Sequence, residues 1–207
     1  MKNKRRYLYL LICLILCMFA LPACSQEEAL NDDGEPLTIE DVWTEEDKFS
    51  IWIDSVTEIS VADAEEYAKN DYLPKTLDDT EGKRYYDITF SYQNINHPGY
   101  REHDKVFEGA MCVCPAVFGE DAQGEMVVSS VYCIADDGGW LTTATIDGEE
   151  VPVTKGVTSS DNHLVVEVDE TAEALTNLDI VFFVPTPETQ SIENGPLYKR
   201  SFLYPLK

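Results

Sequence analysis

The sequence predicts an all-β protein, an antiparallel β-sandwich with one short helical insert. Three observations lead to this fold class. About eight short segments between residues 49 and 206 are apolar or alternate between apolar and polar residues. Turn-forming residues separate these segments, and no regular alternation of strands with long helices is present. Because parallel strands need helical crossovers, this pattern favours antiparallel pairing.

The first elements of the domain are expected from local patterns. Residues 49–59 alternate between apolar and polar side chains and predict a strand. Ser60 is then expected to cap a short helix over residues 60–73, because Asp63 follows it by three positions. The clearest strand is expected at residues 84–94, with one face in the core and the other facing solvent.

The second half of the domain is expected to contain the most buried strand. Residues 106–118 are apolar on both faces and predict a central strand that is covered on both sides. Strands at 126–135 and 140–146, followed by the turn Asp147-Gly148, predict a local antiparallel meander. Later strands are expected at residues 164–168, 178–184 and 197–206.

The polar loop between residues 94 and 104 is the best candidate for ligand contact. It contains His97, Tyr100 and His103, and loops on a rigid scaffold often carry function. Exposed aromatic rings offer a second signal, because Trp52 and Trp140 fall on predicted polar faces or beside turns. The alternative for these two rings is burial in the core of the sandwich, which needs large side chains.

The N-terminus has the layout of a secretory signal. Four cations among the first six residues precede an apolar run of 14 residues, 8–21, which is shorter than the roughly 20 that a transmembrane helix needs. Leu21-Pro22-Ala23-Cys24 resembles the lipobox of bacterial lipoproteins. The resemblance implies a diacylglycerol on the Cys24 thiol and cleavage before Cys24, so that residues 1–23 are the signal peptide. An uncleaved anchor and plain secretion are the alternatives.

The chain that follows the signal is strongly acidic. Removal of the four signal cations leaves 11 basic against 39 acidic residues, a formal charge of −28. Such a charge repels nucleic acid, so we expect no nucleic-acid partner. Acidic residues are dense and basic ones absent at the start, and we expect residues 24–47 to be an acidic flexible spacer that precedes a domain at residues 48–207.

Three cysteines remain in the expected domain, Cys112, Cys114 and Cys133. An extracytoplasmic location permits a disulfide between Cys133 and one of the other two, which leaves one thiol over. The alternative is that all three are buried thiols that behave as small apolar side chains.

Three segments of the predicted domain carry a family resemblance. Phe49-Ser-Ile-Trp-Ile-Asp-Ser-Val, Tyr85-Tyr-Asp-Ile-Thr-Phe-Ser-Tyr-Gln-Asn and Leu178-Asp-Ile-Val-Phe-Phe-Val resemble the immunoglobulin-like domain of DUF4352-type lipoproteins of Gram-positive bacteria. The resemblance covers about 150 residues, and none of its motifs is catalytic. It implies an immunoglobulin-like sandwich that the lipid on Cys24 anchors to the extracytoplasmic face of the cell membrane.

The expected function is therefore a membrane-tethered, non-enzymatic binding module for an unknown protein, peptide or glycan ligand. The sequence shows no nucleophile elbow, no glycine-rich phosphate loop and no close spacing of metal ligands, so we expect no cofactor, metal or catalytic residue. The alternative is a cell-envelope hydrolase or thiol-redox protein that uses the 94–104 loop or the cysteines.

Overall fold

The computed structural model describes residues 36–70, 76–77, 80–102, 105–119, 128–133, 140–169, 178–186 and 197–205. Within these ranges, the side chains of residues 70, 101–102 and 129–133 are not described. Cys24, the signal and residues 24–35 of the expected spacer lie outside the described residues. None of the helices in the described ranges has the length and apolar character that a bilayer crossing requires.

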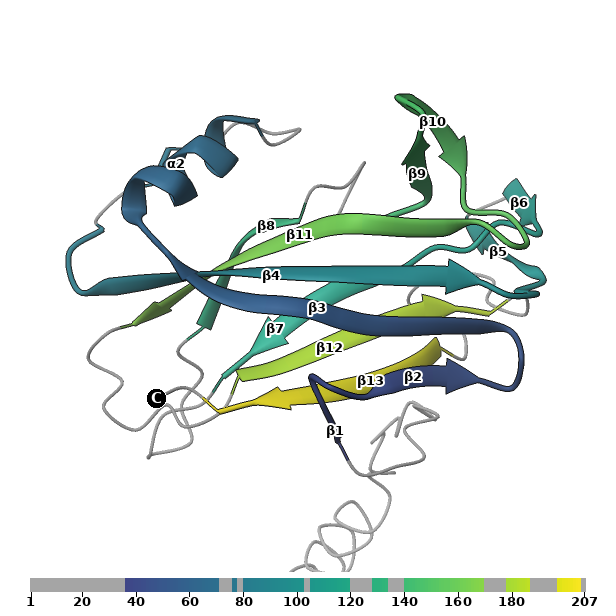
Figure 1. Cartoon of the computed structure of the whole chain (residues 1–207), viewed down its shortest axis with the longest axis horizontal. Coiled ribbons are helices and arrows are strands. Elements are labelled where there is room, and N and C mark those ends of the chain that lie inside the picture. Colours follow the sequence, from purple (N-terminus) through teal and green to yellow (C-terminus); the bar gives the residue numbers. More distant parts are fainter. Residues whose placement is uncertain are drawn as a thin grey trace, which may run out of the picture. The chain divides into compact units, whose positions relative to one another are not determined.

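The described strands form two main sheets (Figure 1). The five-stranded sheet has the order β2-β3-β4-β11-β8, and the four-stranded sheet has the order β1-β13-β12-β7. Their bounds are Leu37–Thr38 (β1), Val42–Glu45 (β2), Phe49–Ile59 (β3), Lys83–Asn94 (β4), Cys114–Phe118 (β7), Val128–Cys133 (β8), Thr158–Asp169 (β11), Leu178–Pro185 (β12) and Leu197–Tyr204 (β13). All pairs in these sheets are antiparallel except β1 with β13. The predicted immunoglobulin-like antiparallel sandwich is confirmed.

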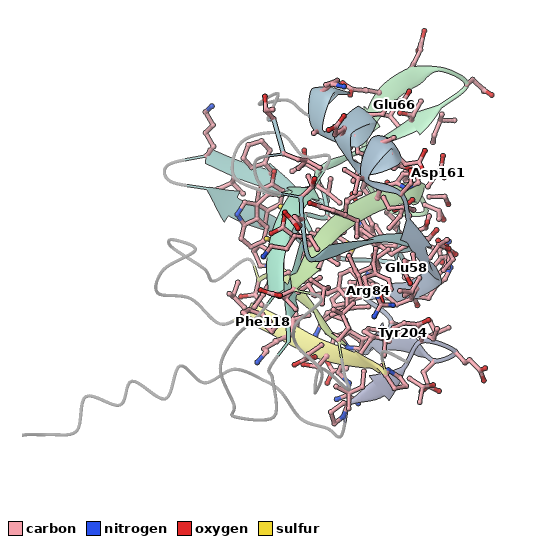
Figure 2. All side chains as sticks on the ribbon, turned by 90° about the vertical axis from the view of Figure 1, so that its left-hand side faces the viewer. Glu58, Glu66, Arg84, Phe118, Asp161 and Tyr204 are labelled. Atoms are coloured by element: carbon pink, nitrogen blue, oxygen red, sulfur yellow. The ribbon has the colours of Figure 1, made fainter. Side chains whose placement is uncertain are left out.

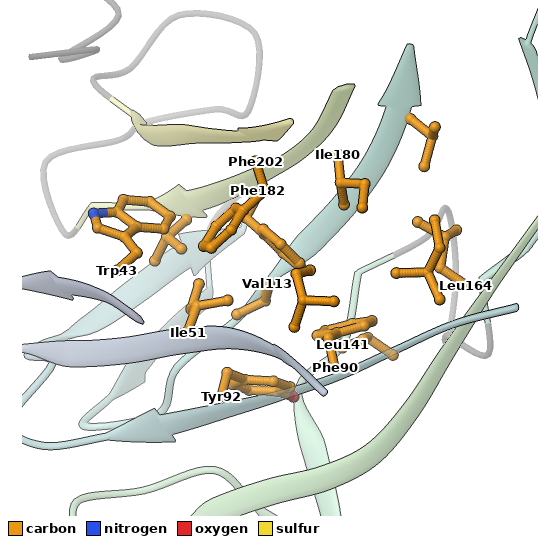
Figure 3. Packing of buried hydrophobic residues seen from close by; sticks show 14 of the residues in the cluster. Trp43, Ile51, Phe90, Tyr92, Val113, Leu141, Leu164, Ile180, Phe182 and Phe202 are labelled. Carbon is orange, nitrogen blue, oxygen red and sulfur yellow. The ribbon is translucent and has the colours of Figure 1, made fainter. Parts of the chain in front are cut away.

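The core lies between the two sheets and is built from alternate residues of facing strands (Figure 3). Phe90 of β4 and Phe182 of β12 are fully buried, with ring centroids 5.0 Å apart. Phe202 of β13 packs edge-on against Phe182 at 5.6 Å. Each side chain of this size stabilises the fold by about 1.5–3 kcal/mol through burial. The core therefore fixes how the two sheets stack.

The predicted helical insert is confirmed as α2, Val61–Asn70. The Asp63 N–H donates to Ser60 Oγ at 3.2 Å, and Asp63 Oδ2 accepts from the Ser60 N–H at 3.3 Å. This reciprocal cap satisfies donors that a helix start leaves open. The helix packs Ala64 and Ala68 against Tyr85, on the outer face of the five-stranded sheet. The β4 face that was expected to meet solvent is therefore partly covered.

The predicted central strand at residues 106–118 was wrong. Its first part belongs to a small hairpin of β5 (Gly99–Glu102) and β6 (Lys105–Glu108), in which Val106 is 54% exposed. Gly109, at φ +70°, then redirects the chain before β7, which is an edge strand. The apolar segment at residues 106–118 therefore contains two short strands, β6 and β7, in place of one buried strand.

The predicted meander also differs from the structure. The strand β8 pairs with β11, while β9 (Thr143–Ile146) and β10 (Glu149–Pro152) form a ribbon of their own. The Asp147-Gly148 turn is confirmed, with φ values of +54° and +82° that suit a two-residue hairpin. The turn was therefore predicted correctly from its two residues, whereas the pairing of β8 with β11 was not predicted.

The folded part begins earlier than the predicted boundary at residue 48. The expected spacer at 24–47 includes β1 and β2, and Trp43 of β2 is buried in the core. Its ring meets Phe49 edge-on at 5.0 Å. The end of this acidic segment is therefore part of the sandwich.

Candidate functional site

A cleft of about 450 Å³ lies where the edges of the two sheets meet. We call it the edge cleft. Residues of β2, of the β2–β3 turn and of β13 line it: Trp43, Thr44, Glu45, Glu46, Lys48, Tyr198, Lys199 and Arg200. Figure 1 shows β2 and β13 next to each other, one from each sheet. The cleft is thus a gap along the side of the sandwich and not a pocket inside a sheet.

The turn between β2 and β3 shapes one wall of the edge cleft. Glu46 and Asp47 have φ values of +34° and +59°, which let the chain reverse in the three residues between the paired Glu45 and Phe49. This reversal brings Lys48 Nζ to 2.9 Å from the Glu46 carboxylate and 2.7 Å from the Tyr198 hydroxyl. These hydrogen bonds, the one to Tyr198 most of all, raise the pKa of Lys48. Lys48 therefore joins the two sheets at the cleft as a fixed cation.

Two further cations line the other wall. The side chains of Lys199 and Arg200 in β13 make no ion pair or hydrogen bond with any described residue, and Arg200 Nε is buried without a described partner. Most other described cations meet a carboxylate. An example is Arg84, which holds Glu58 at 2.7 Å and lowers the pKa of that carboxyl (Figure 2).

The charge of the edge cleft differs from that of the chain as a whole. Its lining holds three of the 11 basic residues that follow the signal, against two carboxylates. The cleft is locally cationic on a strongly acidic protein, and Tyr198 contributes an aromatic residue to its lining, whereas Trp43 is only 6% exposed. An anionic group fits this lining best.

The structure buries His97 and Tyr100, the two described residues that were predicted to contact a ligand, although Asn96 and Pro98 of the same loop are exposed. His97 is 2% exposed and Tyr100 is 6% exposed, and Tyr100 stacks on Phe107 with ring centroids 4.7 Å apart. His103 lies outside the described residues. The two described residues of this predicted contact set are therefore packed into the fold.

Asn94 explains why this loop folds inward. Its side-chain amide donates to the carbonyls of Gly109 and Val153, both at 2.9 Å, and its Oδ1 accepts from the His97 N–H at 2.7 Å. The Gly99 N–H donates to His97 Nδ1 at 3.1 Å, so the proton of the neutral ring sits on Nε2. These hydrogen bonds satisfy buried polar groups of the loop that water does not reach. The loop therefore has a structural role.

Burial also controls the chemistry of His97. It lowers the pKa of the imidazole to about 4, and the charge of Lys48 acts in the same direction, while the carbonyls of Pro185 and Ala110 oppose the shift. Nε2 completes no hydrogen bond with a described atom. The ring is neutral at physiological pH.

The described cysteines are also shielded. Cys112 is buried and Cys114 is half-buried in β7, and the side chain of Cys133 is not described. Burial raises the pKa of the Cys114 thiol to about 11. A thiol with such a pKa is almost fully protonated at neutral pH, and a protonated thiol is a poor nucleophile. A disulfide to Cys133 lies outside what the structure describes.

A second polar cluster lies beneath α2. His163 Nδ1 of β11 is 3.0 Å from Asp87 Oδ1 of β4, and the Tyr67 hydroxyl of the helix donates to Asp87 Oδ2 at 3.0 Å. Burial, followed by the hydrogen bond to Asp87, raises the pKa of Tyr67 to about 12. His163 Nε2 is 3.4 Å from exposed Asp161.

This second cluster has half of a catalytic arrangement. A carboxylate orients the imidazole through Nδ1, as in hydrolytic triads. However, no described serine, threonine or cysteine contacts His163 Nε2, and no three metal-ligating side chains gather anywhere in the described residues. Its evident role is to dock the helix on the sheet.

Sequence reasoning missed both sites. Lys199 and Arg200 stand in a strand that was predicted, but only the meeting of β13 with β2 makes them neighbours of Lys48. The acidic context of Trp43 hid the strand that forms the other wall. The isolated Lys-Arg pair in a chain with few cations was the one available signal.

Comparisons with known proteins add little to this description. No family model and no curated protein matches the chain. Among solved structures, the chain is similar to an uncharacterised β-sandwich protein from Clostridium difficile 630, with 10% identity and a TM-score of 0.36. The match covers 85% of this chain and 96% of the other. At that TM-score the likeness carries no argument about function.

Proposed function

We propose that this chain is a membrane-tethered, non-enzymatic binding module on the extracytoplasmic face of a bacterial membrane, and that the edge cleft binds a carboxylate-bearing ligand. One observation carries the binding part of the proposal. Lys199 and Arg200 line a cleft without a described counter-ion, although carboxylates are abundant in the chain. The lipobox-like sequence before Cys24 supports the tether.

The overall negative charge does not prevent local anion binding. Charges separated by more than about 8 Å are largely screened at physiological ionic strength, so the nearest side chains dominate inside a cleft. An arginine fork and a lysine beside one carboxylate give charge-assisted hydrogen bonds, each contributing about 1.5–3 kcal/mol. The acidic remainder of the surface then disfavours anions elsewhere.

The binding test uses the full chain in detergent micelles. Fluorescently labelled poly-glutamate and polygalacturonate carry the same carboxylate on a peptide and on a glycan, and poly-glutamine is the neutral comparison. We expect the carboxylate polymers to bind, and Lys199→Gln with Arg200→Gln to weaken binding about tenfold or more. The control pair Lys69→Gln with Lys105→Gln makes the same charge change away from the cleft. Equal losses in both pairs, or no binding at all, contradict the cleft as a carboxylate site.

The tether has a separate test. Two or three acyl chains on Cys24 hold a protein firmly, because each buried CH₂ contributes about 0.8 kcal/mol. Cys24→Ser is therefore expected to move the protein from the membrane fraction to the soluble fraction of the producing bacterium. A Cys24→Ser protein that still sediments entirely with membranes contradicts a lipid anchor at this residue.

A hydrolase is the second candidate function, because Asp87 orients His163. The lack of a described nucleophile at Nε2 and the protonated state of the Cys114 thiol favour the binding module. Hydrolysis of a chromogenic ester that is lost in His163→Gln would favour the enzyme.

A further inference from the structure

One edge of β13 is free along most of its length among the residues that the structure describes. On one side, the strand pairs with β12 over its whole length. On the other side, β1 pairs only with Phe202 and Leu203, and no hydrogen bond joins residues 197–201 to the described backbone there. This stretch therefore offers backbone donors and acceptors to a further strand, and its middle residues line the edge cleft.

The two cations of this stretch lie on opposite faces of β13. Arg200 is opposite Phe182 in the register with β12, and Phe182 is fully buried between the two sheets. Arg200 is therefore on the core-facing side of the strand. Lys199, the neighbouring residue, is on the outer side together with Leu203, which is 37% exposed. A ligand that engages both cations must therefore present anionic groups on both sides of the strand edge.

The charges of the lining leave these two cations available. Of the two carboxylates in the cleft, that of Glu46 is already 2.9 Å from Lys48. The side chains of Lys199 and Arg200 have no ion pair with a described residue. The free edge of β13 is therefore complementary to an acidic ligand.

An extended peptide carries charge in the arrangement that this edge requires. Successive side chains of a strand point to opposite faces, and residues opposite each other in neighbouring strands share a face. Two adjacent acidic residues in a strand added to β13 would thus meet Arg200 on one side and Lys199 on the other. A polyuronate glycan has carboxylates but lacks the backbone amides that pair with a strand edge.

We propose that the edge cleft binds an extended acidic peptide of a partner protein, which adds as a strand to residues 197–201 and places adjacent carboxylates on Arg200 and Lys199. This inference rests on the proposed function, because it uses the same cleft and cations, and it names the class of carboxylate ligand. Charged side chains on a free edge oppose pairing with other strands, so the two cations also exclude uncharged and basic peptides. The buried Arg200 Nε gains the acceptor that it lacks among the described residues.

Three capped peptides test the strand addition with the full chain in detergent micelles. The first has two adjacent glutamates between valine and threonine residues. The second has the same side chains but esters in place of its central backbone amides, and the third has glutamines in place of the glutamates. We expect the first peptide to bind about tenfold or more tightly than either of the others, because each of these lacks one part of the recognition. Equal binding of the amide and ester peptides overturns the strand addition.

Hydrogen exchange followed by mass spectrometry locates the added strand. The first peptide should slow amide exchange in residues 197–201 about tenfold or more. Strand β10, Glu149–Pro152, also has one side without a strand partner among the described residues and serves as the control, whose exchange should not change. Absent protection at 197–201, or equal protection in both segments, overturns the proposal. Protection that needs no peptide and grows with protein concentration would identify a second copy of the chain as the occupant, which also overturns it.

Single substitutions test the two faces of the strand. Lys199→Gln and Arg200→Gln should each weaken binding of the first peptide about threefold or more, whereas the distant Lys69→Gln should not. A loss in only one of the two variants contradicts the placement of carboxylates on both faces.

The outcomes separate this inference from the proposed function. If poly-glutamate and polygalacturonate both bind in the cleft while the ester peptide matches the amide peptide, the strand addition fails and the carboxylate site stands. If neither the polymers nor the acidic peptide binds, both fail.

Discussion

The acid sensitivity of the fold should come from His97. The imidazole is buried beneath the 94–99 loop, and Nδ1 is already used as an acceptor from Gly99. A proton can be added only by displacing that N–H from Nδ1. We therefore expect protonation of this ring to unfold the loop junction that Asn94 and His97 form.

The magnitude follows from the pKa of about 4 in the folded state, against an ordinary value of 6.5. The unfolded chain binds the proton more readily, so the contribution of His97 is complete above pH 6.5 and is lost as the pH falls towards 4. Each pH unit in this window costs about 1.4 kcal/mol. Because the slope is smaller at both ends of this window, the loss between pH 6.5 and 4.5 is about 2 kcal/mol.

The assay compares the full-length protein with His97→Gln by urea unfolding at pH 7 and at pH 4.5. Glutamine can still accept from the Gly99 N–H, but it does not titrate. Carboxylates with lowered pKa values, such as Asp41 and Glu58, destabilise both proteins equally in acid and cancel from the comparison. Wild type should lose about 2 kcal/mol more than the variant. Equal losses would show that His97 is not the acid-sensitive group.

Two further predictions follow from local geometry. Gly99→Ala should destabilise the protein by at least about 2 kcal/mol more than Gly82→Ala, measured by urea unfolding, because a Cβ at Gly99 overlaps the Phe107 carbonyl oxygen and one at Gly82 meets open space. Gly82, at φ +73°, is near the left-handed region that alanine can adopt, whereas Gly99, at φ +109°, is outside it, so backbone strain adds to the overlap at Gly99. Equal costs for the two variants would contradict both effects. The Cys114 thiol should react with iodoacetamide about 100-fold more slowly in the folded protein than in urea at neutral pH, because its pKa is raised from 9 to about 11. A folded-state rate close to the rate in urea would contradict this shielding.

The elements that sequence reasoning found are those whose cause is local. Alternation from Phe49 onward gave the bounds of β3. The Ser60 and Asp63 pair gave the start of α2, and Asp147-Gly148 gave the hairpin turn. In each case the residues that determine the structure lie within a few positions of one another, so no knowledge of distant partners was needed.

The failures share the opposite cause. Residues 94–104 resemble a ligand-binding loop because they are polar. In the structure, however, the Asn94 side chain is hydrogen-bonded to the His97 N–H and to the distant Val153 carbonyl. Asp87 and His163 meet because β4 and β11 are neighbours with a particular register, which spacing along the chain does not reveal. The charge density around β2 likewise concealed one buried tryptophan.

Protection of the β13 edge against pairing with other chains explains only one of the two cations on this strand. Charged side chains on a free strand edge discourage unwanted pairing, and this accounts for Lys199. Protection requires a charge that stays in water, however, and Arg200 Nε is buried. Burying an unpaired guanidinium nitrogen costs free energy that a surface charge does not. A carboxylate bound in the cleft removes this cost. The buried Nε of Arg200 therefore supports ligand binding more strongly than the volume of the cleft does.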